Sequence, residues 1–288
     1  MRIGALEAGG TKMVCAIGDE NGNINERITF PTKTPDETMP EILAWFLGRG
    51  IEALGIGCFG PIDLDKKSPQ YGHITSTPKL PWRDFDIVGY FKGLNIPIGF
   101  DTDVNASCLG EATWGGAKDV DSSIYITVGT GVGVGIMAEN RLLHGFTHPE
   151  AGHILLSRAA NDSYPGLCPY HREPHFCLEG MAAGPAILGR WGLNGAELKN
   201  RPEVWELEAY YLSQAIMAYI LILSPKRIIL GGGVMKQEQL FPLIREKTAA
   251  LLNGYAALPA LDSYIIPPAL GDDQGIIGAT QLALKAGA

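Results

Sequence analysis

The sequence predicts an α/β protein that is built from two related lobes with a cleft between them. Short apolar runs bounded by glycine turns, typical of buried strands, alternate along the chain with longer segments typical of helices. A glycine-turned strand pair occurs twice, at residues 4–17 and 124–137. The chain of 288 residues is long enough for two ordinary domains and contains no low-complexity segment.

The first lobe is expected over residues 1–117. Residues 1–30 read as two apolar strands joined by glycine turns and followed by a third strand. Asp36 is placed to cap a helix. The stretch "ALGIGCFGPID" is another buried strand, and "IPIGFDTDVNASCLGEATWG" is a strand that passes into a helix near Asp103.

The second lobe is expected over residues 118–274, with a Cys/His loop at 153–177. The stretch "SSIYITVGTGVGVGIM" gives a strand, a glycine turn and a second strand, and a helix-rich region follows at about 179–223. The stretch "KRIILGGGVM" is a late buried strand that ends in glycines. A final helix at about 275–288 is expected to pack back on the first lobe.

Composition and charge narrow the class of protein. Hydrophobic residues make up 46% of the chain and charged residues 19%, and the net charge is -8. This acidic balance argues against non-specific binding to nucleic acid or to anionic membranes. The apolar run "AIMAYILIL" is far shorter than the roughly 18 residues that cross a bilayer, and we see no secretory signal. We therefore expect a cytoplasmic protein, in which disulfides are uncommon.

The stretch "CPYHREPHFC", residues 168–177, places two of the five cysteines beside two histidines. Cys168, His171 and Cys177 are thiolate and imidazole ligands at short spacings, as in zinc sites, and His153 is the nearest upstream candidate for a fourth ligand. His175 competes with His171 for its place. A disulfide between the two cysteines and a chance cluster in a polar loop are the alternatives.

Three glycine turns at strand ends indicate a nucleotide site. "EAGGTK" places glycines beside a hydroxyl and a lysine, and glycine lets backbone N–H groups approach a phosphate closely. A tight hairpin explains the same glycines. "GTGVGVG" is followed by a strand, whereas a dinucleotide-binding fingerprint requires a helix there. "GGGVM" could admit a flat base against bare backbone.

Asp103 has two interpretations. It stands where a strand meets a helix, so a helix cap is one role for its carboxylate. The other role is a general base at the carboxyl end of a strand, which accepts the proton of a hydroxyl that attacks a phosphoryl group. Spacing alone favours the cap.

The motifs together resemble the ROK family of bacterial sugar kinases and repressors. The stretch "YITVGTGVGVGIMAENRLLHGFTHPEAGHI" resembles the family signature, and "EAGGTK", "GIGCFGPID", "TSTPKLPW", "DTDVNASCLGE" and "GGGVM" extend the likeness along nearly the whole chain. Within the family the chain is most similar to the fructokinase branch. The resemblance implies an actin-like (ribonuclease H-like), two-domain sugar kinase fold and the phosphorylation of D-fructose to D-fructose 6-phosphate by ATP.

The resemblance also assigns residues to sites. It makes Asp103 the catalytic base. The positions that match the ATP-binding elements are Gly9, Gly10, Thr11, Lys12, Gly129, Thr130, Gly131, Gly184, Pro185, Gly231, Gly232, Gly233, Val234 and Met235. The positions that match the sugar site are Gly60, Asn105, Glu150, His153 and Glu179. The positions that match a structural zinc site are His153, Cys168, His171 and Cys177.

The chain departs from the family at three places. Glu7 stands where many members have aspartate, so its role toward Mg²⁺ is open, and Thr102 stands where many kinases have asparagine. The Cys/His loop is longer than the usual zinc loop, which leaves His171 and His175 as alternatives.

The alternative functions are a glucokinase or mannokinase, and a non-catalytic sugar-sensing regulator. The regulators carry a DNA-binding segment ahead of the first phosphate loop, which here begins at residue 7. We expect a small-molecule sugar as the partner, no nucleic acid, no membrane, and a homodimer.

Overall fold

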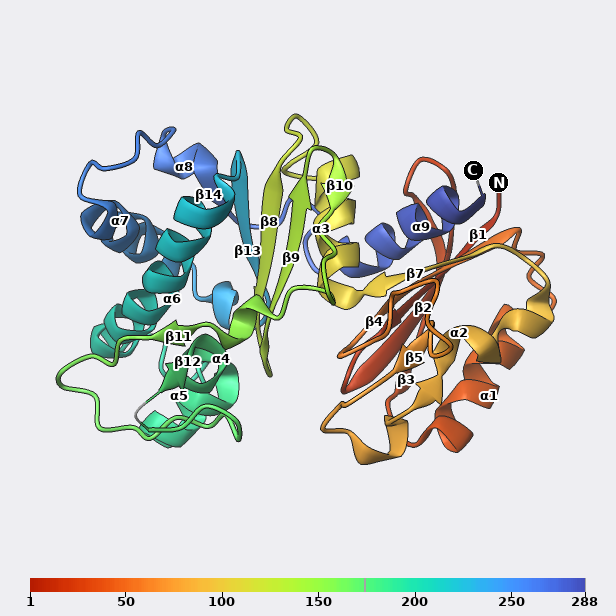
Figure 1. Cartoon of the computed structure of the whole chain (residues 1–288), viewed down its shortest axis with the longest axis horizontal. Helices are drawn as coiled ribbons and strands as arrows, with labels where there is room; N and C mark the ends of the chain where they lie inside the picture. Colours follow the sequence, from red (N-terminus) through yellow and green to blue (C-terminus); the bar gives the residue numbers. More distant parts are fainter. Residues whose placement is uncertain (174, 288) are drawn as a thin grey trace. The chain divides into compact units, whose positions relative to one another are not determined.

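The structure is a computed structural model that describes residues 1–173 and 175–287 (Figure 1). The chain divides into two compact units. Unit 1 consists of Met1–Asp119, Gly135–Pro149 and Ala269–Ala288, and unit 2 of Val120–Val134 and Glu150–Pro268. The second lobe expected from the sequence is thus interrupted at residues 135–149, which belong to unit 1. The expected end of the last helix, Ala288, lies outside the described residues.

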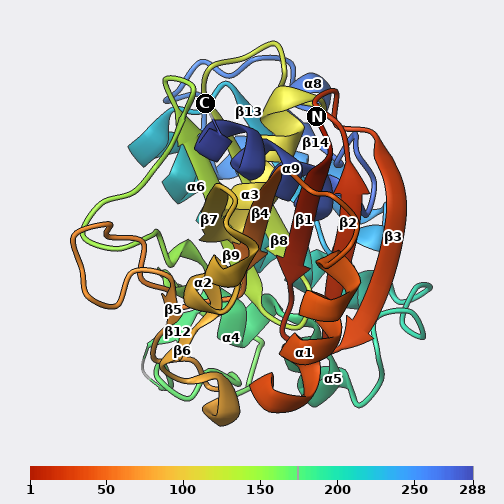
Figure 2. The same cartoon turned by 90° about the vertical axis from the view of Figure 1, so that its right-hand side faces the viewer.

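Unit 1 is built on a five-stranded sheet with the strand order β3-β2-β1-β4-β7 (Figure 2). Its strands are β1 (Ile3–Ala8), β2 (Lys12–Gly18), β3 (Ile24–Pro31), β4 (Ala53–Cys58) and β7 (Ile98–Thr102). The pairs β1–β2 and β2–β3 are antiparallel, whereas β1–β4 and β4–β7 are parallel. The strand β4 is buried along its whole length, and β1 is buried except at the partly buried Glu7. The edge strand β3 alternates between partly buried and exposed residues because only one of its faces is covered.

Side-chain size differs between the two faces of this sheet. Leu6 and its neighbours pack with the apolar residues of α1 (Pro35–Phe46) on one face. Ala5 points to the opposite face, where small residues contact α9 (Gln274–Gly287). The small residues let α9 approach so closely that a Cβ on Gly55 of β4 would lie 1.7 Å from the carbonyl oxygen of Ala279. This packing holds α9 and its neighbour α3 (Asp103–Thr113) against the strands that carry the candidate site.

The remaining parts of unit 1 are short. They are β5 (His73–Ile74), η1 (Leu80–Trp82), β6 (Phe85–Asp86), α2 (Ile87–Tyr90), η2 (Lys92–Leu94) and β10 (Arg141–Leu142). The helix α1 begins after Thr34, which forms a capping box with Glu37. The prediction that Asp36 caps this helix is therefore wrong, because the threonine two residues earlier occupies the cap position.

The second sheet has the strand order β10-β9-β8-β13-β14. Its strands besides β10 are β8 (Ser123–Val128), β9 (Val132–Ala138), β13 (Arg227–Gly231) and β14 (Ile265–Ile266), and the boundary between the units runs through β9. In unit 2, α6 (Pro202–Leu223) packs against α7 (Leu240–Leu252). The other elements of unit 2 are η3 (Ala151–His153), β11 (Leu155–Leu156), β12 (Phe176–Cys177), α4 (Leu178–Ala182), α5 (Gly184–Trp191), η4 (Val234–Lys236) and α8 (Leu261–Tyr264).

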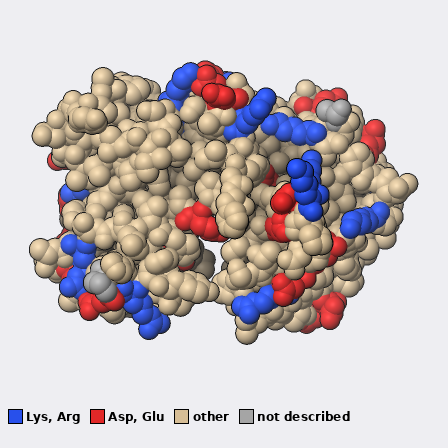
Figure 3. Space-filling view, viewed as in Figure 1, with Lys and Arg blue, Asp and Glu red and all other residues tan. Residues whose placement is uncertain are grey.

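The α/β class and the two glycine-turned hairpins predicted from the sequence are confirmed: the turns after β1 and β8 each join two strands. Among the described residues, no helix combines the length and apolar character needed to cross a membrane. On the face shown in Figure 3, acidic and basic side chains are interspersed, and neither sign forms a continuous patch there.

Candidate active site

The first phosphate loop predicted from the sequence is the tight turn between β1 and β2. The N–H of Gly9 donates to the carbonyl oxygen of Lys12 across 3.1 Å, and a Cβ on Gly9 would lie 2.6 Å from that oxygen. Thr32 of the following segment fixes the turn from outside, because its hydroxyl donates to the carbonyl oxygen of Gly9 across 2.7 Å. The side chains of Thr11 and Lys12 are exposed. A rigid turn with exposed hydroxyl and amine groups suits an anion such as a phosphate.

A second lysine, which the sequence reasoning missed, lies over the same turn. A Cβ on Gly10 would lie 2.9 Å from Cε of Lys79, so the stem of this lysine crosses the bare glycine. Lys79 immediately precedes η1 and belongs to the stretch "TSTPKLPW". Its place in a loop carries no periodic signal, so only the folded structure brings this amine to the turn.

Glu7 lies on β1, below this turn, and a Cβ on Gly275 of α9 would lie 2.8 Å from its carboxyl carbon. Burial is the main cause that raises the pKa of Glu7, and the charge of Lys12 opposes it. The positive end of the α9 dipole lies beside this carboxylate. The carboxyl group of Glu7 therefore lies at the start of α9.

Asp103 is the first residue of α3, but the cap of that helix is Thr102. The hydroxyl oxygen of Thr102 accepts from the N–H of Asn105 across 3.1 Å, which satisfies one of the donors at the helix start. The interpretation of Asp103 as the cap is wrong for this reason. The Asp103 carboxylate accepts from the N–H of Val104 across 2.9 Å and is half-buried. The thiol of Cys58 on β4 has a raised pKa, chiefly through burial and also through the charge of Asp103.

Asn105 is buried, with 1% of its surface exposed, and its amide is fully engaged within unit 1. Its Nδ2 donates to Asp101 across 2.7 Å, and its Oδ1 accepts from the N–H of Ile136 across 3.4 Å. The structure therefore places Asn105 beneath the first turn of α3, where it connects this turn to β7 and β9.

Gly60 lies in the turn after β4, beside a histidine that the sequence reasoning did not single out. His148 is buried, and its Nε2 accepts from the N–H of Ile62 across 3.1 Å. A Cβ on Gly60 would lie 3.3 Å from Cε1 of the same ring. The segment that leads to Glu150 is therefore attached to the loop that carries Gly60.

In unit 2, the predicted nucleotide-binding glycines meet at the end of β8. The N–H of Gly184 donates to the carbonyl oxygen of Gly129 across 2.7 Å, so the start of α5 touches the turn between β8 and β9. Gly232 has a φ of +92°, and a Cβ there would lie 2.4 Å from the carbonyl oxygen of Val128. Both the backbone angle and the close approach require glycine at this position.

The other residues of this group surround the same strand ends. Thr130 is exposed at the tip of the turn between β8 and β9, and Pro185 is the second residue of α5. Gly231 ends β13. Gly233 is exposed, whereas Val234 and Met235 are buried in η4.

Glu179 connects the turn between β8 and β9 to the Cys/His cluster. Its Oε2 accepts from the N–H of Val132 across 3.0 Å, and a Cβ on Gly131 would lie 2.6 Å from that oxygen. Its Oε1 lies 3.9 Å from Nε2 of His153. One carboxylate in the first turn of α4 thus faces both elements.

In the stretch "EAGH", Ala151–His153 form η3, which lies against the start of β9. A Cβ on Gly152 would lie 1.8 Å from the carbonyl oxygen of Val132, so only glycine fits. The hydroxyl of Tyr219 on α6 donates to the carbonyl oxygen of Ala151 across 2.6 Å. Glu150 precedes this turn and is exposed. The packing explains the central glycine of this motif, which the sequence alone did not explain.

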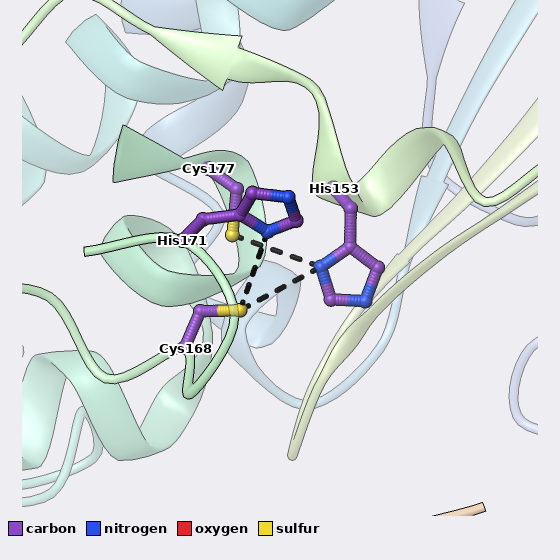
Figure 4. A group of neighbouring side chains, drawn as sticks. All are labelled: His153, Cys168, His171 and Cys177. Carbon is purple, nitrogen blue, oxygen red and sulfur yellow. Dashed lines mark hydrogen bonds between the residues drawn. The ribbon is translucent and has the colours of Figure 1, made fainter. Parts of the chain in front are cut away.

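Figure 4 shows that His153, Cys168, His171 and Cys177 point toward a common centre. Their ligand atoms all lie within 4.8 Å of one another. Nδ1 of His153 lies 3.9 Å from Sγ of Cys168 and 3.7 Å from Sγ of Cys177, and Nδ1 of His171 lies 3.5 Å from Sγ of Cys168. Tetrahedral zinc, with bonds of about 2.3 Å to sulfur and about 2.0–2.1 Å to nitrogen, separates such atoms by about 3.6 Å. The donor set and its spacing therefore fit a four-coordinate metal.

The local fold explains how these ligands come together. Cys177 caps α4, because its Sγ accepts from the N–H of Gly180 across 3.4 Å, and β11 pairs with β12 just after His153. Burial is the largest cause that raises the pKa of the Cys177 thiol to about 12, and a bound cation acts in the opposite sense by favouring the thiolate. His171 lies in this cluster, whereas His175 is exposed and outside it. All five cysteines are free, so the described structure contains no disulfide between Cys168 and Cys177.

This chain is similar to known proteins both in sequence and in fold. The model of the ROK family matches residues 3–286. A fructokinase from Pediococcus pentosaceus is 49% identical over 99% of this chain and 99% of its own length. A fructokinase from Streptococcus mutans is 42% identical over 98% of this chain and 97% of its own length. Among solved structures, the ROK hexokinase from Thermus thermophilus has a TM-score of 0.80 and 25% identity, and covers 99% of this chain and 98% of its own.

Proposed function

Because this chain belongs to the ROK family over nearly its whole length, we propose that it is a fructokinase that transfers the γ-phosphoryl group of ATP to D-fructose. The product is D-fructose 6-phosphate. The observation that carries this proposal is the position of Asp103, a carboxylate in the first turn of α3 whose cap role is filled by Thr102. The similarity to fructokinases selects the sugar.

The proposed reaction uses Asp103 as the general base. Its carboxylate takes the proton from the primary hydroxyl at carbon 6 of the sugar, while the oxygen of that hydroxyl attacks the γ-phosphorus of ATP. The bond from that phosphorus to the bridging oxygen breaks, and ADP leaves. Phosphoryl transfer needs positioning and charge stabilisation more than covalent chemistry, so the other residues act by holding groups in place.

The glycine turns would hold the nucleotide, which arrives as Mg-ATP. In unit 1, the exposed side chains of Thr11 and Lys12 and the stem of Lys79 surround the turn at Gly9 and Gly10. In unit 2, a Cβ on Gly129 or on Gly233 would meet no atom closer than 4.0 Å, so the bare backbone there leaves room for phosphate and base. N–H groups and amines that are fixed before the reaction stabilise the charge of the transferring group without reorganising. We propose that the carboxylate of Glu7 would help to hold the magnesium ion, whose charge would stabilise the transferring phosphoryl group.

The sugar would be held by carboxylates and by the residues around Gly60. Glu150 and Glu179 accept hydrogen bonds and suit the hydroxyl protons of a sugar. In the proposed site the Nε2 of His153 also faces the sugar, because its Nδ1 points into the Cys/His cluster. Asn105 would act indirectly, because its hydrogen bonds fix the position of the first turn of α3.

We propose that the Cys/His cluster binds one structural zinc ion through His153, Cys168, His171 and Cys177. The donor set supports zinc, because two thiolates and two imidazoles at tetrahedral spacing are ligands that zinc prefers. Four protein ligands leave no open position for substrate, so the ion would fix structure. The carboxylate of Glu179 beyond Nε2 of His153 is the kind of partner that orients a metal-bound histidine.

The test is a panel of hexoses assayed for ADP release in the presence of Mg-ATP. We expect fructose to give the highest kcat/KM, with mannose or glucose as weaker substrates, because each has a primary hydroxyl at carbon 6. Loss of one hydrogen-bond partner in a polar site costs about 1–3 kcal/mol, which is roughly 5- to 150-fold in kcat/KM. A higher kcat/KM for glucose than for fructose would assign the chain to a glucokinase, and sugar-independent ADP release would exclude a sugar kinase.

A further inference from the structure

A buried carboxylate lies two residues before the proposed catalytic base. Asp101, at the end of β7, is 3% exposed. One carboxylate oxygen accepts from the N–H of Thr102 across 2.8 Å and from Nδ2 of Asn105 across 2.7 Å. The other lies 2.8 Å from Nε2 of His144, which donates to it because a carboxylate can only accept. No step of the proposed reaction uses this carboxylate or this histidine directly.

The hydrogen bonds of Asp101 fix the amide of Asn105, and the amide fixes the start of α3. The backbone N–H of Asn105 donates to the cap of the helix, and its Oδ1 accepts from Ile136 on β9. The first turn of α3 is also in close contact with β9, because a Cβ on Gly135 of β9 would lie 2.1 Å from the carbonyl oxygen of Val104. Asp103 lies within this turn. A shift of Asn105 therefore displaces Asp103, the proposed general base.

His144 reaches this buried group from a surface segment. It follows β10, and the N–H of the preceding Leu143 donates to the carbonyl oxygen of Ile136 across 2.9 Å. The side chain of His144 is 42% exposed, whereas that of Asp101 is 5% exposed. The imidazole thus exchanges protons with solvent while its Nε2 contacts a carboxylate that solvent scarcely reaches. A change in the pH of the medium therefore changes the charge of His144, which lies beside Asn105.

The protonated imidazole is favoured in this place. The hydrogen bond to Asp101 is the largest cause that raises the pKa of His144, partial burial opposes it, and the charge of Asp101 adds to the increase. The other titratable groups around Asp101 are Tyr71, whose pKa is raised by burial and by the charge of Asp101, and Asp103 with its neighbour Cys58. Charge-assisted hydrogen bonds are roughly twice as strong as neutral ones, so the charged pair holds Asn105 more firmly than the neutral pair.

We propose that Asp101 and His144 form a positioning pair for phosphoryl transfer: the charged pair holds Asn105 and the first turn of α3, and transfer slows when His144 loses its proton. This inference rests on the proposed kinase function and adds a pH-dependent control of its base. The direction follows from the increase in the pKa of His144. The charged pair is present below that pKa, and it is lost as the pH rises through it. The rate of transfer therefore has an alkaline decline that belongs to His144.

The test compares single-turnover transfer rates of the full-length protein across pH, so that product release does not mask the transfer step. The His144→Gln variant keeps an N–H donor but cannot titrate, and we expect its rate to match the high-pH plateau of the wild type without an alkaline decline. His73→Gln is the matched control, because His73 is a histidine of the same unit that also lies beside an aspartate, with Nδ1 3.9 Å from a carboxylate oxygen of Asp86. We expect His73→Gln to keep the wild-type profile.

The Asp101→Asn variant tests the other partner. We expect the NMR titration of His144 to move to lower pH, toward the value of a free histidine, and the rate of transfer to fall roughly 10- to 100-fold, as for small misplacements of a reacting group. The KM for ATP should stay near the wild-type value. An alkaline decline that persists in His144→Gln, or a wild type that lacks one, would overturn the inference even if Asp101→Asn does not fold. Absence of sugar phosphorylation by the wild type at neutral pH would instead overturn the proposed function.

Discussion

Asp103→Asn is expected to fold, to bind ATP with near-normal affinity and to lose most of its transfer activity. Asparagine keeps the size of the side chain and the cap at Thr102, so α3 should form as before. It cannot accept the proton of the sugar hydroxyl. Loss of a general base lowers the rate by about 10²- to 10⁴-fold, or roughly 3–5 kcal/mol of barrier. Single-turnover rates and calorimetric titration with ATP measure the two effects separately.

The matched control for this variant is Asp36→Asn. Asp36 is also an aspartate in the first turn of a helix, but it lies on α1 and is exposed. The same change there should leave turnover within about twofold of the wild type, because surface substitutions of this kind have small effects. Near-normal turnover of Asp103→Asn would remove the general-base role and leave Asp103 as a structural residue at the start of α3.

The second large effect is expected from the Cys/His cluster. If the cluster binds zinc as proposed, Cys168→Ser and Cys177→Ser should each release the ion, because a hydroxyl is a much weaker ligand than a thiolate. Since His153 and Glu179 adjoin the cluster, the KM for fructose should rise roughly 10-fold or more, while the KM for ATP changes less. Metal analysis of the purified protein gives the zinc content, which we expect to be about one ion per chain with two sulfur and two nitrogen ligands.

Two matched pairs control this experiment. Cys15 is a buried thiol on β2, outside the cluster, and Cys15→Ser should keep the zinc ion. His171→Gln should weaken zinc binding, whereas His175→Gln should not, because His175 is exposed and outside the cluster. Metal-free protein that retains full affinity for fructose would show that the cluster does not support the sugar site.

Local patterns in the sequence were sufficient to predict the longer strands and the glycine turns, whereas the family was inferred from the resemblance of several motifs. The hairpins before and after Gly9 and Gly129 follow from apolar runs broken by glycine, which is information carried within a few residues. The predicted cap of α3 was wrong because Thr102 and Asp103 are both good capping residues, and their spacing in the sequence does not distinguish between two adjacent positions. The backbone geometry decides it, since Thr102 is extended and Asp103 already lies in the helix.

Other parts of the site could not be predicted, because they depend on contacts between distant segments. Lys79 meets the first phosphate loop, and His144 meets Asp101, only after the chain folds. The need for glycine at Gly152 comes from the carbonyl oxygen of Val132, twenty residues earlier in the chain. A lone lysine or histidine on a loop has no periodicity that would single it out.

The central claim, that this chain phosphorylates fructose at carbon 6, is tested most directly by phosphorus NMR of a reaction with Mg-ATP and D-fructose. We expect the γ-phosphate signal of ATP to be replaced by one phosphomonoester signal that coincides with D-fructose 6-phosphate, at a rate that Asp103→Asn reduces by about 10²- to 10⁴-fold. A signal of inorganic phosphate alone, or of a fructose ester at another carbon, would contradict the account.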